Sequence, residues 1–333
     1  MQISHVGMLA LQRKGKSLFG VGLLGLFTLL SGCAREVATT TVKPDGSWTR
    51  QVVIHTPKMD MNAPPGPAGP FALKPEDVFD LPAGPNWKIT KSEKDSDAIY
   101  TAERTVPLGA AVDGDIAIKR SNAKSVAVVN QVTVKQVAPG KFVYTETFTW
   151  KGEKPKELLT PEPDEIAAIK EALPDKLATD ANVKALAEQF NHVYWRILFG
   201  PGSPLISNFS QIMAEPEVVE HRIMKQTGPN LERILTDKFA DQLTAEQRHS
   251  VAHKIMHGIL DMSSKKQHNP NPGGNDIPGD VPPVALSIFL KMPGKITQSN
   301  GEADSDAGEV IWSLYPQAAA LGDVTLTATC ETK

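Results

Sequence analysis

Three histidines spaced four residues apart are the first group in the sequence with the chemistry of a metal site. His249, His253 and His257 lie in the segment HSVAHKIMH. On a helix this spacing turns each imidazole by about 40° from the last, so that neighbours share a stripe and could bind one metal ion. The outer pair would be about 12 Å apart along the axis, which is too far for all three to bind one ion. A flank of half-exposed histidines beside an apolar helix face is the favoured alternative.

No other motif supplies a catalytic group. The HExxH pattern of zinc proteases is absent, because Ser250 follows His249. The chain also has no GxSxG nucleophile elbow, no GxGxxG fingerprint and no phosphate-binding P-loop. We therefore predict no catalytic residues and no cofactor, and keep a metal-dependent enzyme that uses the histidines as the alternative.

The first of the two cysteines follows a segment with the layout of a secretory signal. Three basic residues precede an uncharged apolar run over 18–30, and Ser31-Gly32 then lead to Cys33. As a helix the run would span about 20 Å, less than the roughly 30 Å of a bilayer core. We therefore predict that this stretch is removed rather than retained as a membrane helix.

The boundary LSGC, residues 30–33, resembles the lipobox of bacterial lipoproteins. In that family the cysteine becomes the first residue of the mature chain and carries acyl chains such as palmitate, and two or more chains hold stably to a membrane. The resemblance implies a signal peptide over 1–32, a lipid anchor on Cys33 and a place on the extracytoplasmic face of the cell envelope. Ala34, where an inner-membrane retention signal would have Asp, favours the outer membrane if the host has one.

Composition limits the remaining possibilities. The chain has 333 residues with 35 basic and 38 acidic side chains. Without residues 1–32, which hold three basic and no acidic residues, 301 residues remain with a net charge of −6. Basic and acidic residues are interspersed, with no long basic run to bind phosphates, so we predict no nucleic-acid partner. Cys330 would have no disulfide partner if Cys33 is acylated, and we interpret it as a small strand residue.

Residues 33–150 have the pattern of β-strands. Turns are indicated at Pro44-Asp45-Gly46, near 95–97 and at Pro139-Gly140. In the segment KFVYTETFTW, period two places four aromatic residues on one face, which we expect to be buried. Together with Trp312 they are candidates for a hydrophobic ligand pocket, with a plain core as the alternative: Phe142, Tyr144, Phe148 and Trp150.

Residues 151–268 change to a helical period. Apolar residues recur at three and four from Val183 to Ile197, with Asp180 as the expected N-cap and Gly200 as the stop. Further helices are predicted over 217–226, 229–239 and 245–262, and the last begins with the capping-box pair Thr244 and Gln247.

Strand patterns return over 269–333, after a linker rich in Pro and Gly. Four short strands alone would bury little, so we expect them to pair with the N-terminal strands. The predicted fold class is α+β: a single antiparallel sheet domain built from the two ends of the chain, with an inserted all-α unit. Two domains in tandem are the alternative.

Two stretches resemble the LppM-like bacterial lipoproteins. They are VKPDGS, residues 42–47, and MPGKITQSNGE with EVIWSL, within residues 292–314. The resemblance covers about a third of the chain, at its two ends. It implies a lipid-anchored envelope protein with an α+β sheet domain, for which amphiphile binding has been considered, and it supplies no catalytic residues.

The sequence therefore supports three hypotheses. The first is a non-enzymatic, lipid-anchored envelope protein whose sheet domain binds an amphiphile or a protein partner. The second is a metal-binding protein or metal-dependent enzyme. The third makes the helical unit a docking module for an envelope complex. Ligand, partner and oligomeric state are not determined by these patterns.

Overall fold

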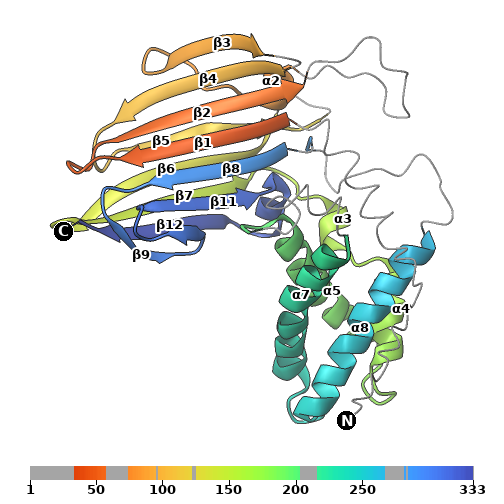
Figure 1. The fold of residues 1–333 in the computed structure, drawn as a ribbon. Helices are drawn as coiled ribbons and strands as arrows, with labels where there is room; N and C mark the ends of the chain where they lie inside the picture. The colour runs from red at the N-terminus through yellow and green to blue at the C-terminus, as the bar shows by residue number, and fades with distance from the viewer. Residues whose placement is uncertain are drawn as a thin grey trace, which may run out of the picture.

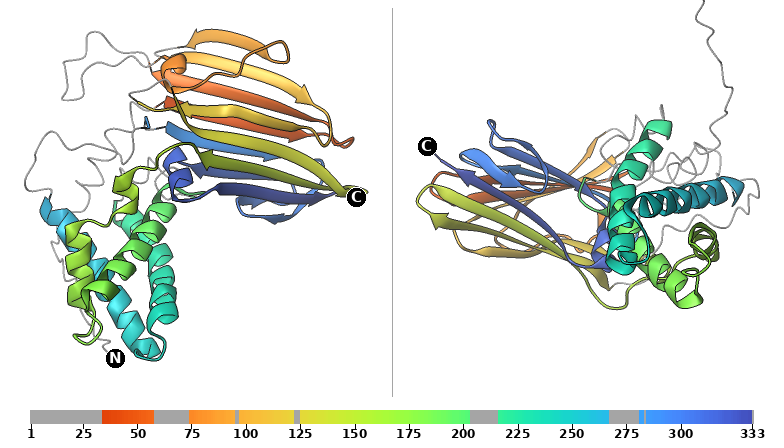
Figure 2. Two further views of the ribbon diagram at one scale, coloured as in Figure 1. Left: turned by 180° about the vertical axis from the view of Figure 1, so that it is seen from behind. Right: turned by 90° about the horizontal axis from the view of Figure 1, so that it is seen from below.

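The computed structural model describes residues 34–57, 74–94, 97–121, 125–202, 216–266, 281–282 and 284–332. Two β-sheets lie face to face, and the helices gather beyond one end of them (Figures 1 and 2). The predicted α+β class is confirmed.

The larger sheet has seven strands in the order β10-β11-β8-β1-β2-β4-β3. Their bounds are β1 (Ala34–Val42), β2 (Trp48–Pro57), β3 (Lys88–Lys94), β4 (Asp97–Val106), β8 (Val284–Lys291), β10 (Glu302–Asp304) and β11 (Glu309–Leu314). The short helix α2 (Pro75–Val78) precedes β3. β1 is the central strand of this sheet, with three strands on either side.

The smaller sheet has five strands in the order β5-β6-β7-β12-β9. Their bounds are β5 (Ala111–Lys119), β6 (Val126–Ala138), β7 (Lys141–Trp150), β9 (Lys295–Ser299) and β12 (Val324–Glu331). Burial alternates along β7, so one face points into the sandwich and the other to solvent. The predicted turn at Pro139-Gly140 joins β6 to β7, with Gly140 at a φ of 71°.

The two ends of the chain share both sheets. β1 pairs with β8, and β7 pairs with β12. The strands of this domain form two largely antiparallel sheets rather than one, and within the larger sheet β1 and β8 run parallel. Two sheets form because each has an apolar inner face, which the other covers. The pair is parallel because the chain returns from the helices to the end at which β1 also begins.

The helical unit consists of α3 (Lys156–Leu159), α4 (Pro163–Ala172), α5 (Asp180–Phe199), α7 (Pro216–Phe239) and α8 (Ala245–Lys266). α5 ends before Gly200 as predicted, but its N-cap is Thr179, whose hydroxyl accepts a hydrogen bond from the Asn182 amide, and not Asp180. The predicted capping box of Thr244 and Gln247 is present.

The two helices predicted over 217–226 and 229–239 form one helix, α7, with Pro229 inside it. Proline removes one backbone hydrogen bond and normally interrupts a helix, which is why the sequence pattern indicated a break. Packing of α7 against both α5 and α8 holds the two halves together.

The helical unit joins the sandwich through α5 and the 3-10 helix η2 (Pro316–Leu321). The Tyr315 amide donates to the Phe199 carbonyl at 2.7 Å, and His192 Nε2 lies 2.7 Å from the Leu321 carbonyl. Aromatic rings continue from α5 into the sandwich, because Trp195 stacks on Phe199 and Phe199 meets Tyr315 edge to face. Tyr194 of α5 packs against both the sandwich core and the helical core, so the two cores meet at this junction.

Candidate functional site: a buried charged cluster between the sheets

The charged cluster in the middle of the sandwich is built around Arg50 of β2. Its Nε donates to Asp115 Oδ2 at 2.6 Å, and its Nη2 donates to Glu146 Oε1 at 2.7 Å. All three side chains are fully buried. Because Asp115 and Glu146 belong to the smaller sheet, these ion pairs tie the two sheets together.

Neutral side chains complete the hydrogen bonding of the two paired carboxylates. Asn130 Nδ2 lies 2.6 Å from Asp115 Oδ1 and 2.7 Å from Glu146 Oε1, and its Oδ1 accepts from the Ile116 amide at 2.9 Å. The Tyr144 hydroxyl donates to Glu146 Oε2. Such charge-assisted bonds are about twice as strong as neutral ones, which offsets part of the cost of burying the charges.

Glu36 of β1 is the third carboxylate of the cluster. It is 0% exposed, and neither of its oxygens has a hydrogen-bond partner within the described part of the chain. Burial raises its pKa well above 4.5, the negative charge of Asp115 raises it further, and Arg50 only partly opposes this. We therefore assign a neutral, protonated Glu36 at pH 7, since an ionised one would be a second uncompensated negative charge in the core.

The pKa values of Arg50 and Tyr144 shift in directions that agree with this assignment. Burial lowers the pKa of Arg50, but the attraction of Asp115 and Glu146 outweighs it, and the pKa of Arg50 lies well above its ordinary value. The pKa of Tyr144 is raised well above 10, first by burial and then by the Glu146 charge. Arg50 is thus charged and Tyr144 is a neutral donor.

Period two along the strands explains why these residues point inward. Trp48, Arg50 and Val52 share the buried face of β2, and Glu36 shares that of β1 with Thr40, whose hydroxyl accepts from Arg50 Nη1 at 2.8 Å. Asp115 needs an irregular strand. The β5–β6 register shifts between Asp113 and Ala117, Gly114 has a φ of 65°, and burial is then continuous through Ile118.

The seven members of this Arg50 cluster are 0–3% exposed: Glu36, Thr40, Arg50, Asp115, Asn130, Tyr144 and Glu146. A substrate has no access to groups enclosed in this way. The chemistry open to the cluster is to hold a proton on Glu36 and to fix the pairing of the sheets.

The predicted aromatic face lies in the same interior. Phe142, Tyr144 and Phe148 are 0–1% exposed and Trp150 is 7% exposed. Trp312 of β11 faces them from the other sheet and stacks on Tyr144 with ring centroids 5.8 Å apart. The structure brings these five residues into one closely packed core, and whether they bind a ligand stays a prediction.

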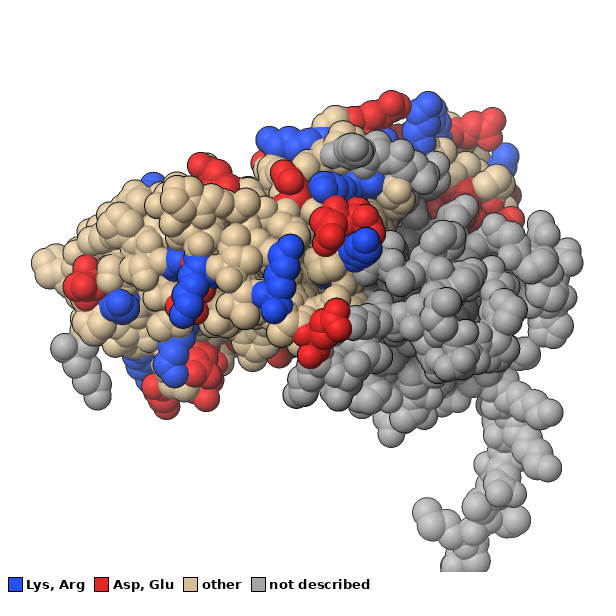
Figure 3. All heavy atoms as spheres, turned by 90° about the horizontal axis from the view of Figure 1, so that it is seen from above, with Lys and Arg blue, Asp and Glu red and all other residues tan. Residues whose placement is uncertain are grey.

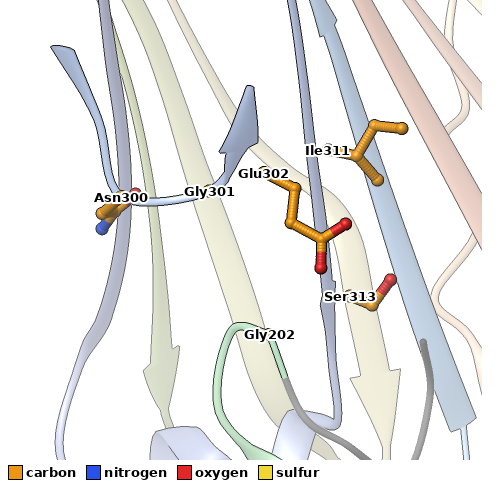
Figure 4. A pocket seen from close by; sticks show the side chains of 6 residues that line it. All are labelled: Gly202, Asn300, Gly301, Glu302, Ile311 and Ser313. Carbon is orange, nitrogen blue, oxygen red and sulfur yellow. The ribbon is translucent and has the colours of Figure 1, made fainter. Parts of the chain in front are cut away.

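A small surface pocket lies near Trp312, between the loop after α5 and the β9–β10 turn. It measures about 100 Å³ and is lined by Gly202, Asn300, Gly301, Glu302, Ile311 and Ser313 (Figure 4). Asn300 is committed to structure, because its Oδ1 accepts from the Trp312 indole at 2.9 Å and from the Thr327 amide. Binding pockets for small molecules usually measure about 300–1,000 Å³. The pocket is therefore too small for most ligands.

The three histidines of the stripe lie on the exposed side of α8. His249 Nδ1 is 2.7 Å from Glu232 Oε1 on α7, whereas the rings of His253 and His257 have centroids 4.3 Å apart. The described residues contain no group of three or more His, Cys, Asp or Glu side chains placed to hold a metal ion. Metal binding by His249, His253 and His257 thus stays a prediction. The two adjacent imidazoles that it would rest on are those of His253 and His257.

Cys33, the predicted lipidation site, lies outside the described residues, as does the signal segment. Cys330 is buried in β12, and burial raises the pKa of its thiol. Among the helices that the structure describes, none combines the length and hydropathy needed to cross a membrane. Viewed from above β3, basic and acidic side chains are mixed rather than separated by sign (Figure 3).

The sequence analysis missed the charged members of the cluster. A signal for one of them was present, since Glu146 lies between Tyr144 and Phe148 at period two, on the face predicted to be buried. Asp115 was missed because no strand was predicted over β5. Asp and Gly are unfavourable in strands, and β5 contains both.

No protein-family model matches the chain, and no curated protein matches its sequence. A weak similarity of fold links it to the folded domain of LppM from Mycobacterium tuberculosis, solved by NMR. The two are 8% identical, and the alignment covers 90% of this chain and 91% of that one with a TM-score of 0.30. The resemblance noted in the sequence thus has a weak counterpart at the level of fold, from which no ligand, partner or site is carried over.

Proposed function

We propose that the protein is a lipid-anchored component of the cell envelope that acts as a non-enzymatic binding protein for another envelope protein. The observation that carries the anchor is the boundary LSGC, residues 30–33, which follows three basic residues and an uncharged apolar run over 18–30. Ala34, the residue after the predicted acylation site Cys33, already belongs to β1.

The filled interior favours a protein partner over an amphiphile. An acyl chain would have to displace buried aromatic residues, and the pocket at Asn300 is too small to replace that space. On the outer face of the larger sheet, by contrast, Phe289 and Ile311 are direct cross-strand partners, 36% and 39% exposed. Exposed apolar side chains placed together in this way are suited to contact with another protein.

Mass spectrometry of the protein extracted from its own membranes tests the anchor. We expect a mature chain that begins at Cys33 with acyl chains attached, and release of the protein from the membrane fraction in a Cys33→Ser variant. A full-length precursor in the cytosol, or a Cys33→Ser variant that stays equally membrane-bound, would contradict the proposal. A stoichiometric lipid retained in addition to the anchor would favour an amphiphile instead of a protein partner.

A photo-crosslinking amino acid at Phe289 tests the partner in living cells. We expect one discrete adduct of higher mass at this position. The same amino acid at Lys43, which is exposed in the β1–β2 turn, serves as the control and should give none. Equal products at the two positions would contradict a specific contact.

Metal binding is the second candidate function, favoured by the adjacent rings of His253 and His257. Elemental analysis of purified protein tests it. Stoichiometric zinc or copper that is lost in His253→Ala but kept in His221→Ala, a change at an exposed histidine of α7, would establish a metal site and displace the proposal of a simple binding protein.

A further inference from the structure

We infer that the pocket at Asn300 receives the end of one arginine side chain of the partner protein, while apolar residues beside that arginine rest on Phe289 and Ile311. The inference rests on the proposed contact with an envelope protein and adds the chemistry that the partner must present. A pocket of about 100 Å³ is too small for most free ligands, but one side chain that is held in place by contacts around it needs no more space.

The pocket and the exposed apolar pair belong to one surface on the outer face of the larger sheet. Glu302 of β10 is the direct cross-strand partner of Ile311, and Ile311 is the direct partner of Phe289. Neighbouring strands lie about 4.8 Å apart, so these three side chains form a row about 10 Å long. Ile311 also lines the pocket. A segment that lies on Phe289 and Ile311 can therefore place one of its side chains in the pocket.

The volume of the pocket fits the end of a single side chain. An apolar cavity of about 150 Å³ accepts a benzene ring of six heavy atoms, so a pocket of about 100 Å³ has room for about four. A guanidinium group has four heavy atoms in one plane. An indole or phenol ring is larger than this space.

Glu302 gives the pocket a negative charge without a counter-ion. Figure 4 shows its carboxylate and the Ser313 hydroxyl on the pocket side of the sheet. On the same face, Glu309 already has a cation, because its Oε1 is 3.0 Å from Lys291 Nζ. Glu302 has no ion pair or hydrogen bond to its side chain among the described residues. A cation brought by the partner would complete it.

The other polar groups of the pocket are committed within the protein. Both ends of the Asn300 side-chain amide are hydrogen-bonded. The Gly301 amide donates to a serine of its own turn at 2.9 Å, and the Gly202 amide donates to the Ser313 carbonyl at 3.0 Å. The side-chain groups that remain for a partner are the Glu302 carboxylate and the Ser313 hydroxyl, both of which accept hydrogen bonds. Arginine has five N–H donors and can bind a carboxylate through two parallel bonds, whereas lysine acts as a point charge.

A photo-crosslinking amino acid at position 289 tests the inference in living cells when it is combined with a change in the pocket. Glu302→Gln removes the charge and keeps the shape of the side chain. Glu309→Gln is the matched control, because it removes one negative charge from the same face outside the pocket. We expect the adduct at 289 to fall several-fold in Glu302→Gln and to stay nearly unchanged in Glu309→Gln. Both positions are exposed, so the urea midpoint should be the same in the two variants.

Mass spectrometry of the crosslinked peptide tests the partner's side of the contact. We expect an arginine within a few residues of the crosslinked position. Its replacement by glutamine in the partner should lower the adduct as much as Glu302→Gln does. The two changes together should cause no further loss, because each removes the same contact.

Three results would overturn the inference and leave the proposed partner in place. They are an adduct that keeps its yield in Glu302→Gln, an equal fall in Glu302→Gln and Glu309→Gln, and a crosslinked segment without an arginine. If the chain that is otherwise unchanged gives no discrete adduct at 289, the proposed contact itself is refuted, and the arginine falls with it.

Discussion

The core between the sheets holds an arginine and three carboxylates, whereas the core formed by α4, α5, α7 and α8 has no charged residue among its described buried side chains. The helical core is built from aliphatic residues and Phe, among them Leu186, Phe190, Leu235 and Ile255. Apolar contacts have little directional preference, so such a core depends mainly on volume and pattern.

The sandwich core adds directional contacts to the same kind of apolar packing. Arg50 reaches across the interface to two strands of the opposite sheet, and each bond has one acceptable geometry. A buried ion pair contributes little net stability over a well-packed apolar pair, but losing one partner is costly. We interpret the Arg50 cluster as a set of contacts that favours one arrangement of the two sheets over others. It adds little to the free energy of unfolding.

Replacing Arg50 should give the largest effect. Arg50→Met leaves Asp115 and Glu146 buried without a countercharge, and we expect a loss of about 3–5 kcal/mol in the free energy of unfolding. Urea denaturation followed by tryptophan fluorescence measures it. The double variant Arg50→Met/Glu146→Gln should recover part of the loss, because it removes one uncompensated charge.

The matched surface pair supplies the control. Lys141 Nζ is 2.8 Å from Glu331 Oε1, with the side chains 41% and 53% exposed. Lys141→Met should change stability by less than about 1 kcal/mol. If Arg50→Met had an equally small effect, the buried ion pairs would be worth no more to stability than the exposed pair.

A cavity in the helical core should cost nearly as much by a different mechanism. Leu235 is fully buried, so Leu235→Ala should destabilise the protein by about 2–5 kcal/mol through lost burial and the remaining void. Tyr194 packs against this core, but burial raises its pKa to about 12, so it stays neutral and the loss should be the same at about pH 5.5 and pH 8. Urea midpoints at the two pH values test this, and a loss that changes with pH would show that the helical core is coupled to titration after all.

Glu36→Gln should stabilise the protein relative to the wild type, and this difference should grow as pH rises. The folded-state pKa of Glu36 lies above its unfolded value near 4.5, so its contribution is fully present below that pH and is lost as pH rises toward the folded pKa. One such group changes the free energy of unfolding by at most about 1.4 kcal/mol per pH unit. Glutamine has the shape of the protonated acid and no proton to lose, so the advantage of the variant should grow above about pH 4.5.

Unfolding free energies of wild type and variant, measured from about pH 4.5 to 8, give the difference directly, because other titrating groups cancel. Glu331→Gln, at an exposed position of β12, is the matched control and should leave the curve nearly unchanged. A difference between variant and wild type that stays constant or falls with increasing pH would show that the pKa of Glu36 is not raised in the folded protein.

The two regions also differ in how much of them the sequence could predict. Helical periodicity identified Val183, Leu186 and Phe190 as one buried face, and all three are buried. Period two likewise identified the aromatic face of β7. Both succeed because burial of an apolar residue can be inferred from its immediate neighbours in the chain.

The Arg50 cluster depends on contacts that a local pattern does not contain. Arg50 is 65 residues from Asp115 and 96 from Glu146 in sequence. A charged residue on a strand is assigned to solvent by default, and only the position of its partner can reverse that assignment. The parallel pairing of β1 with β8 was missed for the same reason, since it is set by where the helical unit returns the chain.

One donor to a glutamate in each region gives the finest comparison. Tyr144 donates to Glu146 inside the sandwich, and His249 contacts Glu232 on the helical surface, where the side chains are 72% and 40% exposed. Tyr144→Phe leaves a buried charged acceptor with one bond fewer, so we expect a loss of about 1–3 kcal/mol. Water replaces the exposed donor, so His249→Ala should cost less than about 1 kcal/mol.

Urea denaturation of both variants under the same conditions measures this pair. The ring of Tyr144 still stacks on Trp312 after the change to Phe, so the measured loss belongs to the hydroxyl and not to packing. If the two losses were equal, the surroundings of a polar contact would not matter in this protein. A larger loss for Tyr144→Phe would instead show that enclosure between the sheets, rather than the type of contact, sets the value of each hydrogen bond in the cluster.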